Sequence, residues 1–221
     1  MTETFYKRFG KRWLDIVCSF AGLIVLSPIF LLVALAVKLT SNGPIFFRQT
    51  RVGQFGDLFR ILKFRTMRVE NAVGASLITA SGDPRITPVG RFLRKTKIDE
   101  LPQLMNVLLG EMSLVGPRPE VSKYVAIYSE SQRLVLLIQP GITGLAAMNN
   151  AQEDELLAAQ QDKERFYRAV LLPAKVAIDM AYCKNVRFTE DLRIIFATFV
   201  KIFRRSDGIS NSLVHAPEKL S

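Results

Sequence analysis

Residues 91–103 read RFLRKTKIDELPQ, a stretch in which four cations precede two adjacent carboxylates, Asp99 and Glu100. Pro102 lies three residues after the first carboxylate. A proline fits best in the first turn of a helix because it has no N–H group to donate. The pattern therefore predicts a helix over 101–109, closed by the glycine that follows. The carboxylates would lie at its positive end, where they stay ionised.

Ionised carboxylates beside phosphate-binding cations are typical of metal-assisted phosphoryl transfer. The single histidine, His215, lies in a polar tail, and Cys18 and Cys183 lack the spacing of metal ligands. We expect both thiols to be packed and unpaired, as in a reducing compartment. A metal would therefore be held by oxygen, which favours Mg²⁺, with Mn²⁺ as the alternative.

The charge of the chain favours anionic partners. Its 221 residues carry a formal net charge of +10, and the mean hydropathy of +0.18 is high for a soluble protein. Nucleic acid, anionic lipid and phosphorylated substrates all suit such a charge. A membrane-anchored nucleic-acid binder is thus one alternative. No recognition helix or aromatic-interleaved RNA motif is visible, so we expect no nucleic-acid partner.

An uncharged run over 16–37 predicts a membrane segment. Its 22 residues would reach about 33 Å as a helix, enough to cross a bilayer core. Ser27 and Pro28 near its middle predict a kink. Cations flank both ends, which places both ends on the cytoplasmic side. The residues alone leave a straight span and a re-entrant helix open. We expect Asp15, near the start, to lie at the headgroup level or to pair with a nearby cation.

A β-hairpin is predicted next, with strands over 44–51 and 58–64 and a glycine-containing turn between them. Its cations include Lys63 and Arg65. They form either a solvated basic face near lipid headgroups or a phosphate-binding surface. Residues 69–82 are rich in small and polar side chains and are expected to form a loop.

Helices are predicted over 88–95, 153–172, 173–184 and 189–203. The first begins with Thr87-Pro88, a capping residue followed by a proline. The segment 153–172 is amphipathic and highly charged, which favours a solvated face. The last helix ends in cations and suits either a membrane surface or core packing.

Arg118 lies between two prolines, and this stiff loop is suited to hold a guanidinium against a phosphate. The alternative is a buried ion pair with Asp99 or Glu100. A second tight turn follows over 139–144.

Eight segments together resemble the bacterial sugar transferase family, the monotopic phosphoglycosyl transferases, from about Lys11 to Arg205. The segments are Lys11–Asp15, Ser27-Pro28, Gly43–Gln49, Lys63–Met67, Asp83–Thr87, Ile98–Gln103, Gly110–Pro119 and Pro140–Gly144. The block from Asp83 to Pro119 is the most specific of them.

The resemblance implies transfer of a sugar-1-phosphate from a UDP-sugar to polyprenyl (undecaprenyl) phosphate, giving a polyprenyl diphosphate sugar and UMP. This is the first membrane step of a bacterial glycan pathway. Asp99 would be the nucleophile that forms a covalent phospho-sugar intermediate, and Glu100 would help to bind Mg²⁺ or handle protons. A non-catalytic scaffold is the other alternative, and the intact pair of carboxylates argues against it. The residues implied to bind substrate are Lys63, Arg65, Arg94, Arg118 and Thr143.

The resemblance also implies the architecture, an α+β, mostly helical, monotopic membrane protein and a minimal single-domain member. A basic segment and a re-entrant helix broken at Ser27-Pro28 would occupy 1–38. A catalytic domain with a small hairpin and surface amphipathic helices would occupy 39–205, on the cytoplasmic face of the bacterial inner membrane. We expect a disordered tail over 206–221. The chain departs from the family pattern at Gln139, Ala147, Met148, Asn149 and Asn150.

Overall fold

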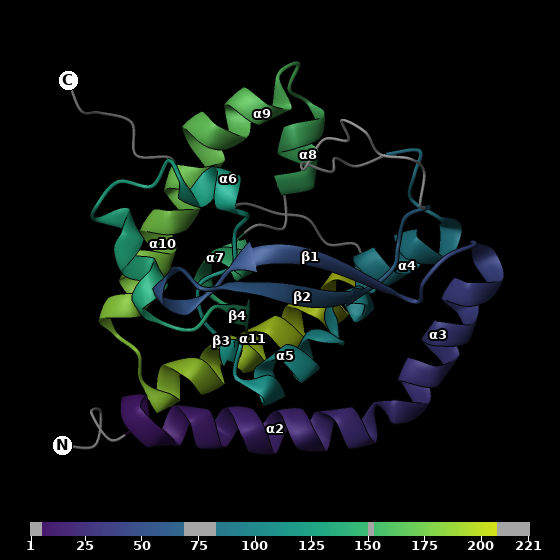
Figure 1. Cartoon of the computed structure of the whole chain (residues 1–221), viewed down its shortest axis with the longest axis horizontal. Helices are drawn as coiled ribbons and strands as arrows, with labels where there is room; N and C mark the ends of the chain where they lie inside the picture. Colours follow the sequence, from purple (N-terminus) through teal and green to yellow (C-terminus); the bar gives the residue numbers. More distant parts are fainter. Residues whose placement is uncertain (1–5, 69–82, 150–152, 207–221) are drawn as a thin grey trace.

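The computed structural model describes residues 6–68, 83–149 and 153–206, and it is mostly helical with two small sheets (Figure 1). This confirms the predicted α+β class. The helices are α2 (Lys11–Val25), α3 (Ser27–Thr40), α4 (Pro88–Thr96), α5 (Gln103–Leu109), α6 (Ser122–Val125), α7 (Leu145–Asn149), α8 (Glu153–Ala158), α9 (Lys163–Phe166), α10 (Leu172–Lys184) and α11 (Phe188–Ser206). The strands are β1 (Phe46–Val52), β2 (Leu58–Phe64), β3 (Ser113–Val115) and β4 (Gly141–Thr143). The described residues exclude the predicted loop over 69–82, Asn150, His215 and the predicted tail from 207 onward. The first residue assigned to that tail, Ser206, is instead the last residue of α11.

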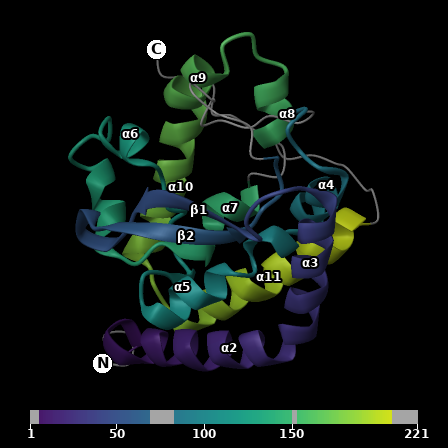
Figure 2. The same cartoon turned by 45° about the vertical axis from the view of Figure 1, so that its right-hand side comes forward.

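The predicted kink is present between α2 and α3, which meet at a bend of 62° (Figures 1 and 2). Pro28 cannot donate to the carbonyl of Ile24, and the hydroxyl of Ser27 donates to that oxygen instead, at 2.7 Å. Within the described ranges no single helix has the length and apolar character to cross a bilayer. The bent pair passes the same test when its two arms are taken together.

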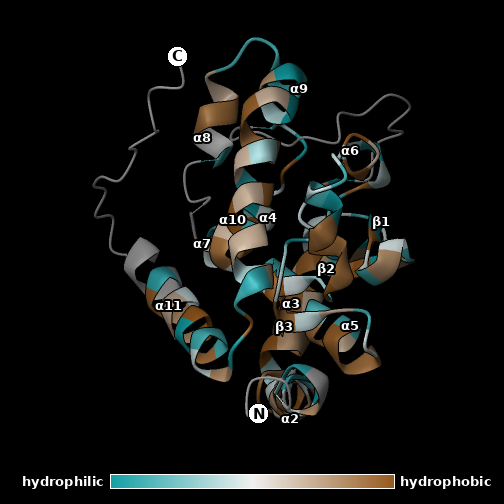
Figure 3. Cartoon of the chain, turned by 90° about the vertical axis from the view of Figure 1, so that its left-hand side faces the viewer, coloured by the Kyte–Doolittle hydropathy of each residue, from teal (hydrophilic) through white to brown (hydrophobic). Residues whose placement is uncertain are grey.

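Large apolar side chains project outward from both arms of the bent pair. They are Trp13, Ile16, Val17, Phe20, Ile24, Val25, Ile29, Leu31, Leu32, Leu35 and Leu39. Cys18 is exposed on α2, so the prediction that it is packed is wrong, whereas both cysteines are free as expected. Figure 3, which looks along α2, shows the largely apolar α5 packed beside it, above and to the right in this view.

The predicted hairpin is confirmed, since β1 and β2 pair antiparallel with Phe46 opposite Phe64. Phe64 is fully buried and packs with Val37 of α3 and Leu93 of α4. The predicted helix over 88–95 is also confirmed, because Thr87 caps α4 by accepting from the N–H of Gly90 at 2.9 Å. This core ties the bent pair, the hairpin and α4 together. A second sheet is formed by β3 and β4, which pair in parallel.

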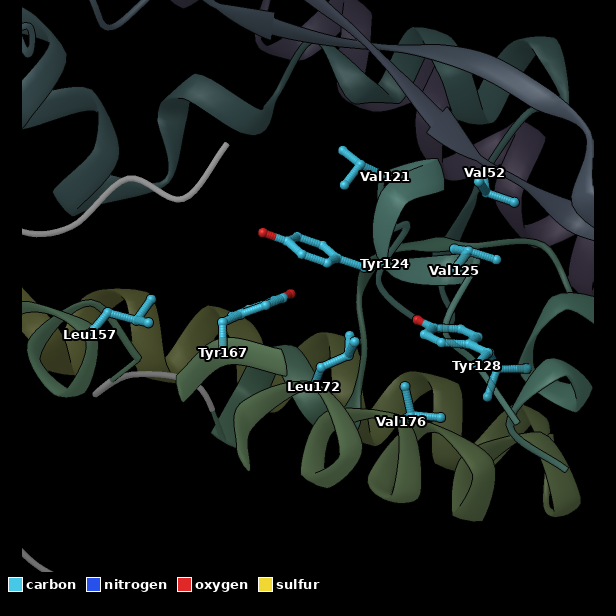
Figure 4. Packing of buried hydrophobic residues seen from close by; sticks show 10 residues of the cluster. Val52, Val121, Tyr124, Val125, Tyr128, Leu157, Tyr167, Leu172 and Val176 are labelled. Atoms are coloured by element: carbon cyan, nitrogen blue, oxygen red, sulfur yellow. The ribbon is translucent and has the colours of Figure 1, made fainter. Parts of the chain in front are cut away.

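The expected helix over 153–172 is divided into α8, α9 and a π-helical turn over Tyr167–Leu171. Asp162 starts a new helix because its carboxylate accepts from the N–H of Arg165 at 2.9 Å. The predicted solvated face is present, since Asp162, Lys163, Arg165 and Arg168 are exposed. The opposite side packs inward, with Leu157, Tyr167 and Leu172 buried in a core cluster (Figure 4). The helices predicted over 173–184 and 189–203 correspond to α10 and α11.

Candidate active site

The two carboxylates lie in a short 3₁₀ turn, Ile98–Glu100, between α4 and α5. Lys97 ends α4 in a left-handed conformation (φ 60°), which redirects the chain before α5 begins at Gln103. The predicted helix start at 101 is therefore two residues early. Asp99 and Glu100 are buried, with 6% and 8% of their surface exposed. Both carboxylates are thus fixed between two packed helices.

Glu100 is held by two cations. Its Oε1 accepts from Lys63 Nζ at 2.8 Å and from Arg118 Nη2 at 3.0 Å. Burial alone would raise the pKa of Glu100, but the charges of Lys63 and Arg118 outweigh it and hold this pKa well below its usual range. Glu100 is therefore an ionised carboxylate, and the ion pair named as an alternative for Arg118 is present.

Asp99 has the opposite environment. Its Oδ1 is buried and has no hydrogen-bond partner in the described part of the chain. Burial raises the pKa of Asp99 to about 6, the adjacent charge of Glu100 adds to the rise, and Lys63 opposes it. Two neighbouring carboxylates with different pKa values are a common basis for different catalytic roles. Here the side chain with the free oxygen is Asp99.

The structure joins two of the predicted substrate-binding residues, Lys63 and Arg118, at the carboxylate pair. Arg94 acts on Asp99 through its positive charge, which lowers the pKa of that carboxyl. Arg65 is engaged elsewhere: it is buried and donates to the carbonyl oxygens of residues 41 and 42, at the end of α3. The hydroxyl of Thr143 pairs with that of a threonine on α11. Substrate contacts by Arg65 and Thr143 therefore stay predictions.

Two residues that support the Arg118 loop were not predicted. Asp179 of α10 accepts from the N–H of Arg118 at 3.3 Å and from that of Ala146 at 3.4 Å. Arg51 of β1 donates to the carbonyl of Pro119 at 3.2 Å. Each contact joins segments far apart in the sequence, and no local pattern marks these side chains.

The position of Asp99 fits a divalent metal with few protein ligands. The described residues contain no group of three or more His, Cys, Asp or Glu side chains suited to a metal. Mg²⁺ is usually held by one or two carboxylates together with substrate phosphates and water. The unpartnered oxygen of Asp99 and the neighbouring carboxylate of Glu100 meet that requirement.

Gln139, where the chain departs from the family pattern, links the second tight turn to α5, the helix that follows the two carboxylates. Its Nε2 donates to the carbonyl of Gly110, the residue that ends α5, at 2.7 Å. Met148 packs beside a buried cluster that includes Tyr182 and Ile194. These two departures therefore serve packing and helix termination.

Comparison with known proteins gives concordant matches. The model of a family described as bacterial sugar transferase matches residues 6–205. The exopolysaccharide production protein PSS of Rhizobium leguminosarum bv. phaseoli is 41% identical over 207 residues, covering 90% of this chain and 97% of that protein.

Two larger relatives match over part of their length. UDP-glucose:undecaprenyl-phosphate glucose-1-phosphate transferases of Klebsiella pneumoniae and Escherichia coli (strain K12) are 39% and 38% identical to this chain. The matches cover 87% and 89% of this chain and 40% of each relative. The chain thus spans nearly all of the Rhizobium protein and two fifths of these two.

Proposed function

This chain belongs to the bacterial sugar transferase family, and from that premise we propose that it transfers a sugar-1-phosphate from a UDP-sugar to undecaprenyl phosphate. The products are a polyprenyl diphosphate sugar and UMP. The observation that carries the proposal is the buried pair Asp99–Glu100, with two cations on Glu100 and a free oxygen on Asp99. UDP-glucose is the first donor to test, because two relatives are named for it.

We propose two displacement steps at Asp99. In the first, its free carboxylate oxygen attacks the phosphorus that carries the sugar, the bond to the UMP phosphate breaks, and UMP leaves with the electron pair. In the second, an oxygen of polyprenyl phosphate attacks the same phosphorus and expels Asp99. Splitting one displacement into two requires an ionised nucleophile. Mg²⁺, when bound, would neutralise the charge of the diphosphate.

Glu100 has a supporting role in this proposal. As an ionised carboxylate it orients Lys63 and Arg118, whose positive charges suit the phosphate of the leaving UMP. The side chain of Arg118 is 32% exposed, so its guanidinium can hold Glu100 and also face a substrate. Arg94 adds positive charge beside the nucleophile. The site thus combines one attacking oxygen with several cations for phosphate.

We also propose that α2 and α3 form a re-entrant membrane segment with both ends on the cytoplasmic side of the bacterial inner membrane. The 62° bend at Ser27-Pro28, the outward apolar side chains and the cations at both ends support this topology. With this topology the carboxylates would lie at the membrane surface, where a lipid phosphate can meet a soluble nucleotide sugar. A cysteine at exposed position 7, with Cys18 and Cys183 changed to serine, should resist a membrane-impermeant reagent added outside cells. Labelling from outside would indicate a true span.

The activity is tested with purified protein in detergent, a panel of UDP-sugars, undecaprenyl phosphate and Mg²⁺. We expect UMP release with one or more donors, its loss on chelation with EDTA, and its loss in Asp99→Asn. Asp57→Asn is the matched control, because Asp57 is exposed at the hairpin turn. Without lipid acceptor, mass spectrometry should find a phospho-sugar on Asp99. Continued turnover by a folded Asp99→Asn protein would refute the nucleophile assignment.

A further inference from the structure

The charged residues at the start of α2 face the interior of the protein. Asp15 is buried, with 1% of its surface exposed. Its Oδ1 accepts from the N–H of Leu114 at 2.8 Å and from the hydroxyl of Ser113 at 3.1 Å. The expectation that Asp15 lies at the headgroup level is therefore wrong, although the charge of nearby Lys11 does act on its carboxylate. Asp15 binds strand β3 instead.

Neighbouring residues of the same helical turn hold both elements of the candidate active site. Lys11 Nζ donates to the carbonyl of Val115, the last residue of β3, at 2.8 Å. Arg12 donates to the carbonyls of Val107 and Leu108 at 2.6 and 2.8 Å. Those two carbonyls end α5, the helix that follows the carboxylate pair. The start of α2 thus joins α5, which follows the carboxylate pair, to β3, which leads to Arg118.

The segment between the end of β3 and Arg118 is short and tightly packed. A Cβ on Gly116 would lie 2.4 Å from the carbonyl oxygen of Gln139, so the backbone of this residue packs directly against the second turn and leaves no room for a side chain. Pro117 and Pro119 fix the backbone on either side of Arg118. A shift of β3 at Leu114 would therefore pass to Arg118, which must stay within 3.0 Å of Glu100.

We infer that Asp15 is a positioning residue for the transfer reaction: it holds β3 so that Arg118 reaches Glu100 beside the nucleophile. This inference rests on the proposed function. It gives the bent helix pair a second task, because the helix that carries the outward apolar side chains also supports the active-site loop. Asp15 contacts no substrate and acts only through β3 and Arg118.

The first test compares three variants of Asp15 and its neighbour by kcat/KM for the UDP-sugar. Asp15→Ala removes the acceptor and should lower kcat/KM by about tenfold, whereas Asp15→Asn keeps an oxygen at that place and should stay within about twofold. Ser19→Ala is the matched control, because Ser19 lies one turn later on the same buried face and its hydroxyl has no partner among the described residues. It should leave kcat/KM unchanged.

The second test is a double-mutant cycle with Arg118→Lys. If Asp15 acts through Arg118, Asp15→Ala should lower kcat/KM by less than about twofold in the Arg118→Lys background, because the effects of coupled residues are not additive. The same tenfold loss in both backgrounds would refute the positioning role. Should Asp15→Ala fail to fold, Ser113→Ala removes one donor to the same oxygen, and its smaller loss should also vanish in the Arg118→Lys background.

If the proposed function is wrong, the wild-type protein itself will be inactive, which differs from a loss confined to the Asp15 variants. A wild-type protein that releases no UMP with any donor would refute the proposed reaction. The positioning role would then be tested by UMP binding, measured by titration calorimetry through the same cycle. Weaker binding in Asp15→Ala, absent when Arg118 is also changed, would support it, and equal losses in both backgrounds would refute it.

Discussion

At the scale of single residues, Asp99 combines a raised pKa with an unpartnered oxygen, which is costly for stability. The pKa of its folded form is about 6, above the usual 3.8, so the folded state prefers the protonated acid. The cost of the charge is therefore present above pH 6 and disappears as pH falls below 4. Without metal, Asp99→Asn should be more stable than wild type by on the order of 2 kcal/mol at pH 7.5 and equal to it near pH 4. Thermal unfolding in EDTA at both pH values measures this; a lower Tm for Asp99→Asn at pH 7.5 would contradict it.

The same residue should report Mg²⁺ binding without turnover. A ligand that binds only the folded protein stabilises it, by about 1.4 kcal/mol at ten times its Kd. For a chain of this size we expect the Tm of wild type to rise by about 3–6 °C. Asp99→Asn should show little of this rise, because it lacks the charged ligand. An equal rise in both proteins would place the metal elsewhere.

At the scale of elements, the close approach of α4 to the end of β2 sets where Arg94 lies. A Cβ on Gly90 would lie 2.0 Å from the carbonyl oxygen of Thr66, so alanine there must push α4 away. Gly90→Ala should lower stability by more than about 3 kcal/mol or prevent folding. Gly22→Ala is the matched control in another helix, since its Cβ would meet only a flexible leucine side chain at 3.3 Å. A Tm near that of wild type for Gly90→Ala would contradict the packing described here.

Elements with local signals were predictable from the sequence. Thr87 before a proline identified the start of α4, and two short apolar runs on either side of a glycine-containing turn identified the hairpin. The division of 153–172 does have a local signal in Asp162, which caps α9, whereas the contact between the hydroxyl of Tyr167 and Glu120, 47 residues away, has none. In the site, the sequence motifs around Lys63 and Arg118 predicted that these cations belong to it. Asp179, by contrast, is identified only by its contact with the Arg118 loop.

At the scale of the whole molecule, a buried ion pair joins the first long helix to the last. Lys11 Nζ lies 2.7 Å from Asp191 Oδ2, and both side chains are almost fully buried. Asp191 also accepts from the hydroxyls of Tyr6 and Tyr182, at 2.6 and 2.7 Å. These contacts fix α2 against α11 at the end remote from the bend, so they hold the bent helix pair to the rest of the protein.

Lys11→Met should therefore be strongly destabilising, by about 3–5 kcal/mol, because it leaves the charge of Asp191 buried without its cation. The double variant Lys11→Met/Asp191→Asn should be more stable than Lys11→Met alone. Asparagine removes the unpaired charge and still accepts a hydrogen bond from Tyr182. Chemical unfolding of the three proteins in detergent compares them. A double variant less stable than Lys11→Met would show that the charge of Asp191 is not the source of the loss.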